Sequence, residues 1–242
     1  MTTLPCLVLG GGLGTRMRPA TDSVPKPLLP VAGEPFAVHQ LRWLVSEGVT
    51  EIVYSIGHLG QLLRDELGGR TDLGCSIRFV DEGPSLLGTG GAVRLAVDRE
   101  PILGGDFFVL YGDSYLDVDL GAVAAAFRAS GSEALMTVFR NDSKWERSNV
   151  VFEDGRVERY DKLEADPTAA GMHHVDYGLS VLSADAVRAG IPSGTVADLA
   201  DLYRDLSLGG RLAGFEAAHR FYEIGTPTGL ADLEAHLAGG AR

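Results

Sequence analysis

Short apolar runs alternate with stretches of helical apolar spacing through the first half of the chain. The runs, each of a length typical of buried strands, cover residues 4–9, 52–56, 77–80 and 107–111. The helical spacings between them cover residues 36–47, a stretch from about residue 61, and residues 92–97. This alternation predicts right-handed βαβ connections and therefore an α/β fold with a doubly wound, mostly parallel, Rossmann-like sheet.

The pattern changes beyond about residue 130, where strand-like runs follow one another with few helices between them. These runs cover residues 134–139, 149–152, 157–160 and 175–182, and Glu-Asp-Gly-Arg at 153–156 is typical of a hairpin turn. Amphipathic helices are predicted at 196–208 and 228–237. We expect one domain over residues 1–242, in which residues 131–242 add an antiparallel extension and closing helices to the parallel half of residues 1–130.

The formal net charge of −12 argues against nucleic acid or an anionic membrane as the main partner, because both require a basic surface. Lysine occurs only at positions 26, 144 and 162, so a lysine within a motif is unusually informative. Cys6 and Cys75 lie at apolar runs and are interpreted as small buried hydrophobic residues. Since the sequence shows neither a secretory signal pattern nor an apolar stretch of membrane-spanning length, we expect a cytoplasmic protein.

A glycine-rich segment directly follows the first apolar run. It supplies Gly10, Gly11, Gly12, Gly14, Thr15 and Arg16, and ten residues after Arg16 comes Lys26, which stands between two prolines. Glycines allow backbone N–H groups to approach an anion, and a guanidinium offers a fork of donors suited to phosphate oxygens. The prolines fix the backbone around Lys26, so its ammonium adds a second positive charge at a defined place. The segment predicts a cradle for a nucleoside triphosphate.

Two commoner glycine motifs do not fit this segment. A P-loop requires Gly-Lys-Ser/Thr, and the dipeptide Gly-Lys does not occur in the chain. A dinucleotide fingerprint requires the glycines to open directly into a helix, whereas four prolines between residues 19 and 30 keep the segment irregular. An ordinary glycine-rich turn is the alternative, although it leaves the spacing of Arg16 and Lys26 unexplained.

Three motifs extend along the chain: Gly-Gly-Leu-Gly-Thr-Arg at 11–16, Pro-Lys-Pro-Leu-Leu-Pro at 25–30, and Gly-Thr-Pro at 225–227. With them the sequence resembles the sugar-1-phosphate nucleotidyltransferases, the pyrophosphorylases that make nucleotide sugars. Within that family it looks most like the heptose-1-phosphate guanylyltransferases, on the strength of Val-Ala-Gly-Glu-Pro-Phe at 31–36, Leu-Gly-Thr-Gly-Gly-Ala at 87–92 and Gly-Asp-Ser at 112–114.

The resemblance implies that the phosphate of a sugar 1-phosphate attacks the α-phosphorus of a nucleoside triphosphate, with pyrophosphate as the leaving group. The attacking phosphate is already ionised, so the protein has only to position the substrates and neutralise charge. In this interpretation residues 1–130 bind the nucleotide, with Arg16 on the β- and γ-phosphates and Lys26 on the α-phosphate. Residues 131–242 bind the sugar.

Two carboxylates are candidate ligands for Mg²⁺. Asp113 directly follows a predicted strand, at the edge where ligands of open α/β sheets bind, and Mg²⁺ takes one or two protein oxygens beside a triphosphate. Capping of the following turn is the alternative for Asp113. The resemblance implies a second ligand two residues before a Gly-Thr pair, where this chain has Glu223 in place of the family's Asp. The additional methylene changes the reach of that carboxylate, and a solvated glutamate at a strand end is the alternative.

On the sugar side, Asp161-Lys162 resembles the family's Glu-Lys pair, whose lysine holds the sugar phosphate. A cation is needed there because two phosphate-bearing substrates must come together, and an exposed hairpin lysine is the alternative. Asp176-Tyr177-Gly178 occupies the place of a family Asn-Ala-Gly motif that contacts sugar hydroxyls, so Asp176 and Gly178 are candidate sugar-binding residues. An ionised aspartate accepts hydrogen bonds but does not donate them, which leaves the choice of sugar open.

Residues 81–83 and 88–91 lie where related enzymes read the nucleobase, so Glu82, Gly88 and Thr89 are candidate nucleotide-binding residues. The Glu82 carboxylate is able to accept from both N1–H and the 2-amino group of guanine, donors that adenine, uracil and thymine do not offer together. We therefore expect GTP and a heptose or hexose 1-phosphate as substrates. UTP, ATP, CTP, dTTP and a cyclitol phosphate stay open as alternatives.

Two other classes of protein also stay open. Asp117 and Asp119 form an Asp-x-Asp sequence as in glycosyltransferases, although Asp119 is better placed to cap a helix that begins near residue 120. The substitution at Glu223 leaves room for a non-catalytic subunit that binds nucleotide sugars. His173 and His174 lack a third ligand at metal spacing and are interpreted as structural or sugar-lining residues. A homo-oligomer is compatible with the sequence.

Overall fold

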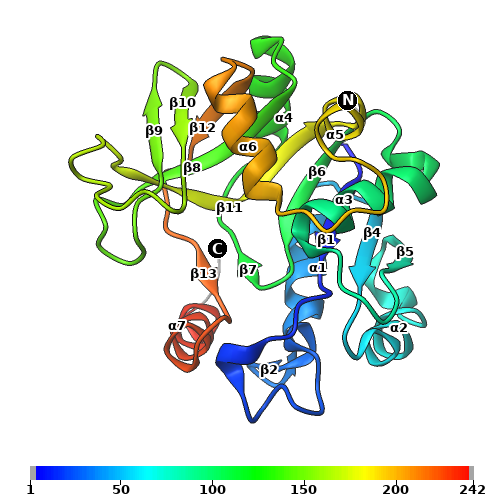
Figure 1. The fold of residues 1–242 in the computed structure, drawn as a ribbon. Helices are drawn as coiled ribbons and strands as arrows, with labels where there is room; N and C mark the ends of the chain where they lie inside the picture. The colour runs from blue at the N-terminus through cyan, green and yellow to red at the C-terminus, as the bar shows by residue number, and fades with distance from the viewer. Residues whose placement is uncertain (1–3, 240–242) are drawn as a thin grey trace.

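The computed structural model describes residues 4–239, and a nine-stranded sheet runs through them (Figure 1). Its strand order is β5-β4-β1-β6-β11-β8-β12-β10-β9. The strands of the first half are mutually parallel: β1 (Cys6–Leu9), β4 (Glu51–Ile56), β5 (Ser76–Asp81) and β6 (Asp106–Tyr111). The order reverses between β1 and β6, as in a doubly wound sheet, so the predicted fold class is confirmed.

The second half continues this sheet mainly with antiparallel strands. They are β8 (Ala134–Arg140), β9 (Val150–Glu153), β10 (Arg156–Tyr160) and β11 (His174–Ser183), with β11 antiparallel to both β6 and β8. The predicted hairpin turn joins β9 to β10, and Asp154 and Gly155 both have positive φ, 47° and 77°. The expected antiparallel extension is therefore present.

One strand of the second half escaped the sequence analysis. β12 (Leu212–Glu216) pairs parallel to β8 and antiparallel to β10. Its central Gly214 weakens the strand signal, yet a Cβ at that position would lie 2.5 Å from the ring of Phe152. Gly214 is therefore required for the packing of β12 against Phe152, although it also weakens the sequence pattern by which a strand is recognised.

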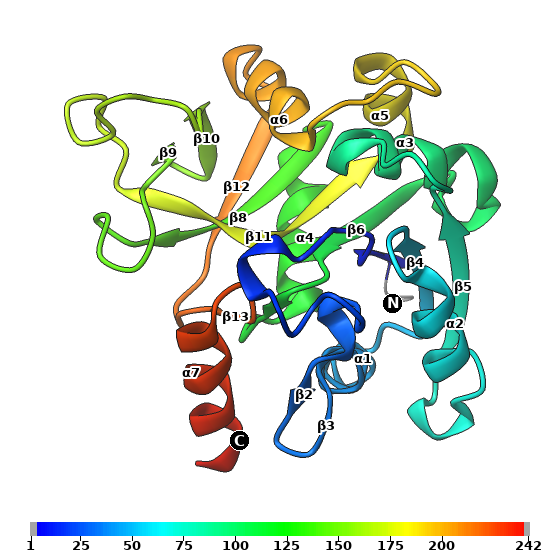
Figure 2. The same cartoon turned by 60° about the horizontal axis from the view of Figure 1, so that its bottom comes forward.

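Helices cover both faces of the sheet (Figures 1 and 2). They are α1 (Phe36–Ser46), α2 (Gly60–Leu67), α3 (Gly88–Arg99), α4 (Leu120–Ser130), α5 (Ala184–Gly190) and α6 (Leu199–Leu208), whereas α7 (Pro227–Ala238) lies apart from them. The side chains of neighbouring residues in β1 point to opposite faces of the sheet, because side chains alternate along a strand. Val8 packs in a core with α1, α2 and α4, whereas Leu7 packs in a second core with α3, α5 and α6.

Two helices begin at different residues from those predicted. α3 begins at Gly88 rather than residue 92, and α6 begins at Leu199 rather than residue 196. Asp198 sets the start of α6, because its Oδ1 accepts from the Ala200 N–H at 3.0 Å. The residues just before it are extended and lie against the start of α3, where the Ala197 carbonyl accepts from the N–H groups of Gly90 and Gly91 at 2.9 and 3.2 Å.

Two short ladders lie outside the large sheet. β7 (Ser114–Tyr115) pairs antiparallel with β13 (Tyr222–Glu223), and β2 (Pro30–Val31) pairs with β3 (Glu34–Pro35). Figure 2 shows α7 beside these ladders and away from the main sheet. A small core joins them, formed by Val31, Phe36, Ile224 and Leu233. The C-terminal helix is thus fastened to the segment that follows Lys26.

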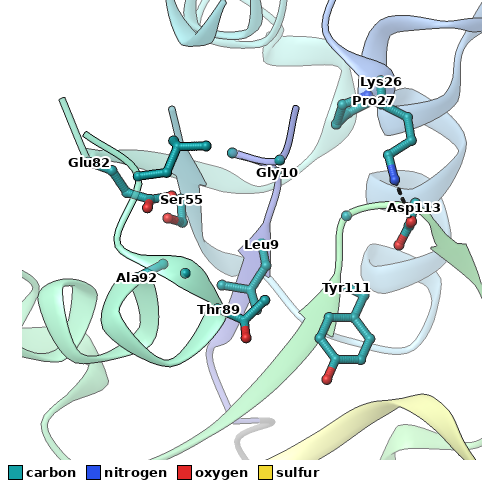
Figure 3. A pocket seen from close by; sticks show the side chains of 15 residues that line it. Leu9, Gly10, Lys26, Pro27, Ser55, Glu82, Thr89, Ala92, Tyr111 and Asp113 are labelled. Atoms are coloured by element: carbon teal, nitrogen blue, oxygen red, sulfur yellow. Dashed lines mark hydrogen bonds and ion pairs between the residues drawn. The ribbon is translucent and has the colours of Figure 1, made fainter. Parts of the chain in front are cut away.

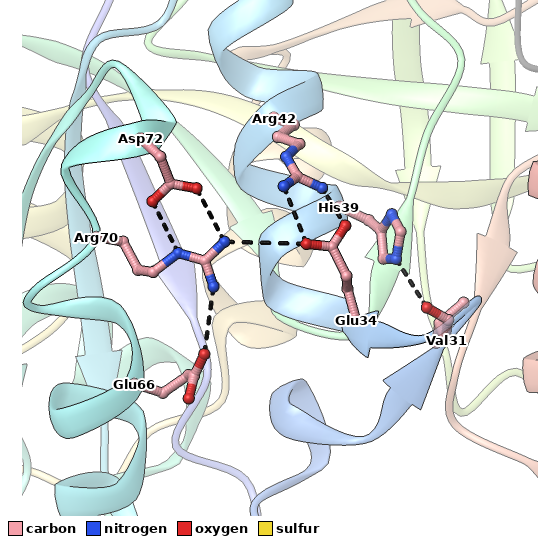
Figure 4. A network of polar contacts seen from close by, with 7 residues as sticks. All are labelled: Val31, Glu34, His39, Arg42, Glu66, Arg70 and Asp72. Carbon is pink, nitrogen blue, oxygen red and sulfur yellow. Dashed lines mark hydrogen bonds and ion pairs between the residues drawn. The ribbon is translucent and has the colours of Figure 1, made fainter.

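A polar network fixes the β2–β3 hairpin to the helices beside it (Figure 4). The Glu34 carboxylate accepts from both terminal nitrogens of Arg42 and lies 3.9 Å from Arg70, and the hydrogen bond from Arg42 lowers the pKa of Glu34. On the other side of the hairpin, the Val31 carbonyl oxygen lies 2.8 Å from His39 Nε2. Each exposed pair contributes little stability, so the network acts chiefly on the orientation of the hairpin.

The two cysteines differ in burial. Cys6 is fully buried, and burial raises the pKa of its thiol, whereas Cys75 is half-buried; neither forms a disulfide. Among residues 4–239, every helix is too short or too polar to cross a membrane.

Candidate active site

A cleft of two adjoining chambers opens at the carboxyl ends of β1 and β6, where the strand order reverses. The first chamber is lined by residues 9–12 and by Lys26, Ser55, Glu82 and Gly112 among others. The second is lined by Glu146, Asn149, Lys162, Asp176, Gly178, Asp198 and Glu223 among others. Thr89, Tyr111 and Asp113 line both chambers, so the two are parts of one cleft.

The glycines around the first chamber differ in what a side chain at each position would contact. A Cβ on Gly10 would lie 2.2 Å from the ring of Tyr54, and one on Gly112 would lie 2.4 Å from the Leu9 carbonyl oxygen. A Cβ on Gly12 would meet no described protein atom within 4 Å. Packing therefore requires Gly10 and Gly112, whereas Gly12 borders open space in which a ligand can approach the backbone.

Glu82 lies against the glycine loop on the wall of the first chamber (Figure 3). Its Oε1 is 2.5 Å from the position of a Cβ on Gly11, and its Oε2 accepts from the Leu87 N–H at 2.9 Å. Burial raises the pKa of this carboxyl above its ordinary value. One oxygen is thus held by the 82–87 loop, and the other remains beside the glycine backbone.

Lys26 and Asp113 meet at the edge of the first chamber. The Lys26 Nζ lies 2.6 Å from Asp113 Oδ2, and the two side chains are only 17% and 20% exposed (Figure 3). A short 3₁₀ turn, Lys26–Leu28, orients the lysine, with Pro25 preceding it in extended conformation. The ion pair places a cation next to the first candidate metal ligand.

Arg16 comes from the other end of the glycine segment. It follows Gly14, whose φ of 61° starts the 3₁₀ turn Thr15–Met17, and both Thr15 and Arg16 are exposed. Its Nη2 lies 3.1 Å from the position of a Cβ on Gly225. Within residues 4–239 the guanidinium makes no hydrogen bond or ion pair, but Gly14, Thr15 and Arg16 line neither chamber.

The β7–β13 ladder brings the second candidate metal ligand to the cleft. Glu223 pairs with Ser114, and the Ile224 N–H donates to the Asp113 carbonyl at 3.0 Å. Burial, together with the neighbouring carboxylates of Glu146 and Asp113, raises the pKa of Glu223 to about 7, although Arg16 opposes the shift. A divalent cation at this point would relieve the repulsion among these carboxylates.

The donor set suits a hard metal ion that is shared with a substrate. No group of three His, Cys, Asp or Glu side chains in the described part of the chain is arranged to hold a metal by itself. Mg²⁺ needs only one or two carboxylates and completes its octahedron with phosphate oxygens and water. Asp113 and Glu223, adjacent through the ladder, fit that requirement.

In the second chamber, Lys162 forms an ion pair with Asp198. Deeper in the chamber, Asp176 accepts from the Gly178 N–H at 2.9 Å and from the Tyr111 hydroxyl at 3.4 Å. Burial raises the pKa of Asp176 to about 6. Gly178 has a φ of 96°, and a Cβ there would lie 2.8 Å from Ser114 Oγ, so both conformation and space demand glycine.

Some candidate residues lie away from the chamber walls. Asp161 accepts from the Leu163 N–H at 3.0 Å and pairs with Arg159 at 3.3 Å, and it lines neither chamber. His173 pairs with Asp142 at 3.1 Å, whereas His174 lies 3.2 Å from Glu216. Both histidines are also outside the chamber walls, so the structural interpretation fits them better.

The sequence analysis missed three polar residues of the second chamber: Glu146, Asn149 and Asp198. Asn149 Oδ1 accepts from the Asp176 N–H at 3.1 Å and so fixes the strand that carries that carboxylate. A signal existed for Asp198, because an aspartate just before an apolar helical run is a typical N-cap. No sequence signal marked Glu146, because nothing in its local sequence indicates that its loop reaches Glu223.

Comparison with known proteins adds independent findings. Residues 6–165 match the model of the family described as nucleotidyl transferase. An N-acetylmuramate alpha-1-phosphate uridylyltransferase of Neisseria meningitidis is 31% identical over 98% of this chain and 99% of that protein. A mannose-1-phosphate guanyltransferase of Gibberella zeae is 33% identical over 73% of this chain, but that match spans only 49% of the longer protein.

A solved structure supports the fold separately. HddC from Yersinia pseudotuberculosis aligns with a TM-score of 0.79 over 97% of this chain and 99% of that chain. The sequence identity in that alignment is 22%, so the likeness concerns the fold alone.

Proposed function

The chain belongs to the nucleotidyl transferase family, and from that membership we propose that it joins a nucleoside triphosphate to a sugar 1-phosphate, giving a nucleotide sugar and pyrophosphate. The observation that carries the proposal is the cleft of two chambers that meet at Asp113. A triphosphate in the first chamber and a sugar phosphate in the second would approach each other at that residue. The transferred phosphorus then lies at the boundary of the chambers.

The cations divide between the two substrates. Arg16 holds the β- and γ-phosphates and the departing pyrophosphate, and Lys26 holds the α-phosphate; the free guanidinium of Arg16 and the position of Lys26 beside Asp113 support these roles. Lys162 holds the phosphate of the sugar, on the opposite side of the boundary. These groups align the attacking oxygen, and no general base is needed because the attacking phosphate is ionised.

Asp113 and Glu223 hold Mg²⁺ when it is bound. Bound there, the ion would supply positive charge that offsets the negative charge of the phosphate oxygens. In the absence of the ion, Lys26 is the cation that compensates Asp113. Glu223 differs from an aspartate by one methylene, and the β7–β13 ladder supports its reach because it fixes the backbone of both carboxylates.

GTP is the proposed nucleotide. Glu82 supports this choice, since its Oε1 lies beside the backbone of Gly11 on the chamber wall and offers an acceptor for the N1–H and 2-amino group of guanine. The Neisseria relative carries a uridylyltransferase name, and UTP is therefore the first alternative. Changing Glu82 to Gln tests the proposal, because the single amide oxygen cannot serve both the Leu87 N–H and the guanine donors; an unchanged preference for GTP would refute it.

The proposed sugar is a heptose or hexose. Asp176, an acceptor that burial holds partly protonated near pH 6, supports a contact with a sugar hydroxyl. Gly178 lets the strand that carries Asp176 pack closely against Ser114 on the wall of the same chamber. N-acetylmuramate, named for the Neisseria relative, is the alternative of larger size.

The direct test is a screen for pyrophosphate release with Mg²⁺. GTP, UTP, ATP, CTP and dTTP are each paired with a panel of hexose, heptose and N-acetylmuramate 1-phosphates. Release that requires both a triphosphate and a sugar phosphate supports the proposal and names the substrates. Release of a nucleoside diphosphate from a nucleotide sugar would instead indicate a glycosyltransferase.

A further inference from the structure

Asp198 contacts both halves of the cleft, although no motif marks it. We propose that Asp198 is a positioning residue that holds Lys162 against the sugar-phosphate side of the cleft and ties it to the nucleotide side through Thr89. The inference rests on the proposed function, in which Lys162 binds the phosphate of the sugar. It adds a residue whose own side chain need not touch either substrate.

The contacts of Asp198 are divided between its two oxygens. Oδ2 forms the ion pair with Lys162. Oδ1 accepts from the Thr89 hydroxyl at 3.2 Å and from the Ala200 N–H at 3.0 Å. The Thr89 hydroxyl in turn accepts from the Leu199 N–H at 2.9 Å. A single carboxylate thus joins the start of α3, the start of α6 and the lysine.

The backbone around these side chains is closely packed. The Ala197 N–H donates to the Leu87 carbonyl at 2.9 Å, and the Ala197 carbonyl accepts from the start of α3. A Cβ on Gly88 would lie 2.5 Å from the Ala197 carbonyl oxygen, and one on Gly91 would lie 2.5 Å from that of Thr195. These glycines therefore allow α3 to dock on the segment that carries Asp198. The backbone that carries Asp198 is therefore packed directly against the start of α3.

Lys162 needs such a partner because its surroundings do not otherwise fix it. Its side chain is 43% exposed, and a free lysine loses considerable rotamer entropy when it is immobilised on a phosphate. An ammonium has three donors, so one can remain on Asp198 while others bind phosphate oxygens. Since Lys162 contacts the sugar phosphate before and during the displacement, loss of its positioning should raise KM more than it lowers kcat.

Asp119 provides the matched control. It caps α4 as Asp198 caps α6, with Oδ1 accepting from the Ala122 N–H at 2.9 Å. It lines neither chamber and has no lysine partner among the described residues. A role limited to helix capping would make Asp198 and Asp119 variants behave alike.

The kinetic experiment uses the substrate pair that the pyrophosphate screen identifies. Asp198→Asn keeps an oxygen acceptor for the cap but removes the charge, so we expect the KM for the sugar phosphate to rise about tenfold, the size of a lost charged hydrogen bond. The kcat and the KM for the nucleotide should stay within about twofold. Asp198→Glu should recover part of the loss, and Asp119→Asn should change none of these constants.

A second measurement does not depend on turnover. Only three lysines occur in the chain, so their side-chain NMR signals can be assigned with Lys162→Gln and followed during a titration with inorganic phosphate. We expect the Lys162 signal to respond in the wild type, with phosphate binding several-fold weaker in Asp198→Asn. The Lys144 signal serves as the internal control.

The outcomes separate the two proposals. If the wild type transfers nucleotide but Asp198→Asn has an unchanged or lower KM for the sugar phosphate, the positioning role is wrong and the proposed function stands. If the wild type is inactive with every pair, the proposed function fails and the phosphate titration decides the positioning role alone. Equal phosphate affinity in the wild type and Asp198→Asn, or no response of Lys162, would overturn it.

Discussion

The two chambers of the cleft are built in different ways. The first takes its walls from segments that directly follow parallel strands, such as Gly10 after β1 and Gly112 after β6. The second collects Lys162, Asp198 and Glu223 from a loop, a helix start and a short ladder that are far apart in the sequence. The first is therefore a property of the sheet, whereas the second depends on pairs of distant side chains.

The two chambers also differ in the number of carboxylates that surround their lysine. In the first, Lys26 shares the wall with the carboxylates of Glu82 and Asp113, whereas Arg16, unpaired within the described residues, lines neither chamber. In the second, the single lysine faces several carboxylates, of which Asp176 and Glu223 have pKa values raised to about 6 and about 7 by burial. The first chamber therefore has fewer carboxylates around its lysine and opposes the approach of an anionic ligand less than the second does.

The largest expected effects follow from removing the charge of Asp113, where the chambers meet, or that of Arg16, the cation proposed to hold the β- and γ-phosphates. Arg16→Ala and Asp113→Ala should each lower kcat/KM by about 10² to 10³-fold, roughly 3 to 4 kcal/mol, because each removes a group that acts on the transferring phosphates. Steady-state kinetics with the identified pair provide the measurement. Near-wild-type turnover in either variant would remove that residue from the site.

A second test compares two glycines of the first chamber. Gly112→Ala should destabilise the fold by about 3 kcal/mol, because its Cβ would lie 2.4 Å from a backbone oxygen that cannot move aside. Gly12→Ala should leave the melting temperature unchanged and raise the KM for the nucleotide, because only the ligand occupies that space. Thermal denaturation and nucleotide titration check the two effects. Equal stability of the two variants would contradict the packing argument.

A third test concerns the buried carboxyl of the second chamber. Burial raises the pKa of Asp176 from its ordinary 3.8 to about 6, so between these values the folded state retains a proton that the unfolded state has lost. Its contribution to stability is therefore present below about pH 4 and is lost as the pH rises to about 6, by about 3 kcal/mol in total. Asp176→Asn lacks this dependence. Parallel stability curves for the two proteins over this range would show that the site is hydrated.

The smallest effect is expected outside the cleft. Asp119→Ala removes the cap of α4 and should cost about 1 kcal/mol of stability with unchanged kinetics. Denaturant unfolding measures the loss. A change in either KM would mean that α4 is coupled to the cleft, and that Asp119 is not a neutral control.

The sequence predicts the first chamber better than the second, because the walls of the first directly follow strands that are visible in the sequence. The glycine loop and Asp113 are contiguous with strong apolar runs, so their place at the strand ends follows from the doubly wound topology. Glu146 reaches the second chamber through a loop whose path no local pattern describes. Asp198 carries a cap signal, but its ion pair with Lys162 exists only in the folded chain.

Secondary structure shows the same division. The parallel strands of the first half were predicted to within one residue, except that β1 begins at Cys6 instead of residue 4. α5 was missed because it is a seven-residue, alanine-rich helix with little periodicity, although Ser183 caps it. The early start of α3 follows from long-range docking, since its glycines have poor helix propensity and are explained only by the Ala197 carbonyl.

We expect a single displacement, in which the sugar phosphate of the second chamber attacks the triphosphate of the first. The most direct measurement uses a sugar 1-phosphate carrying heavy oxygen in its phosphate, incubated with the unlabelled triphosphate, Mg²⁺ and the enzyme, and follows the label by mass spectrometry. If the phosphate of the sugar attacks the α-phosphorus, all of the label enters the nucleotide sugar and none enters pyrophosphate. Label in the released pyrophosphate, or hydrolysis of the triphosphate without formation of a nucleotide sugar, would contradict it.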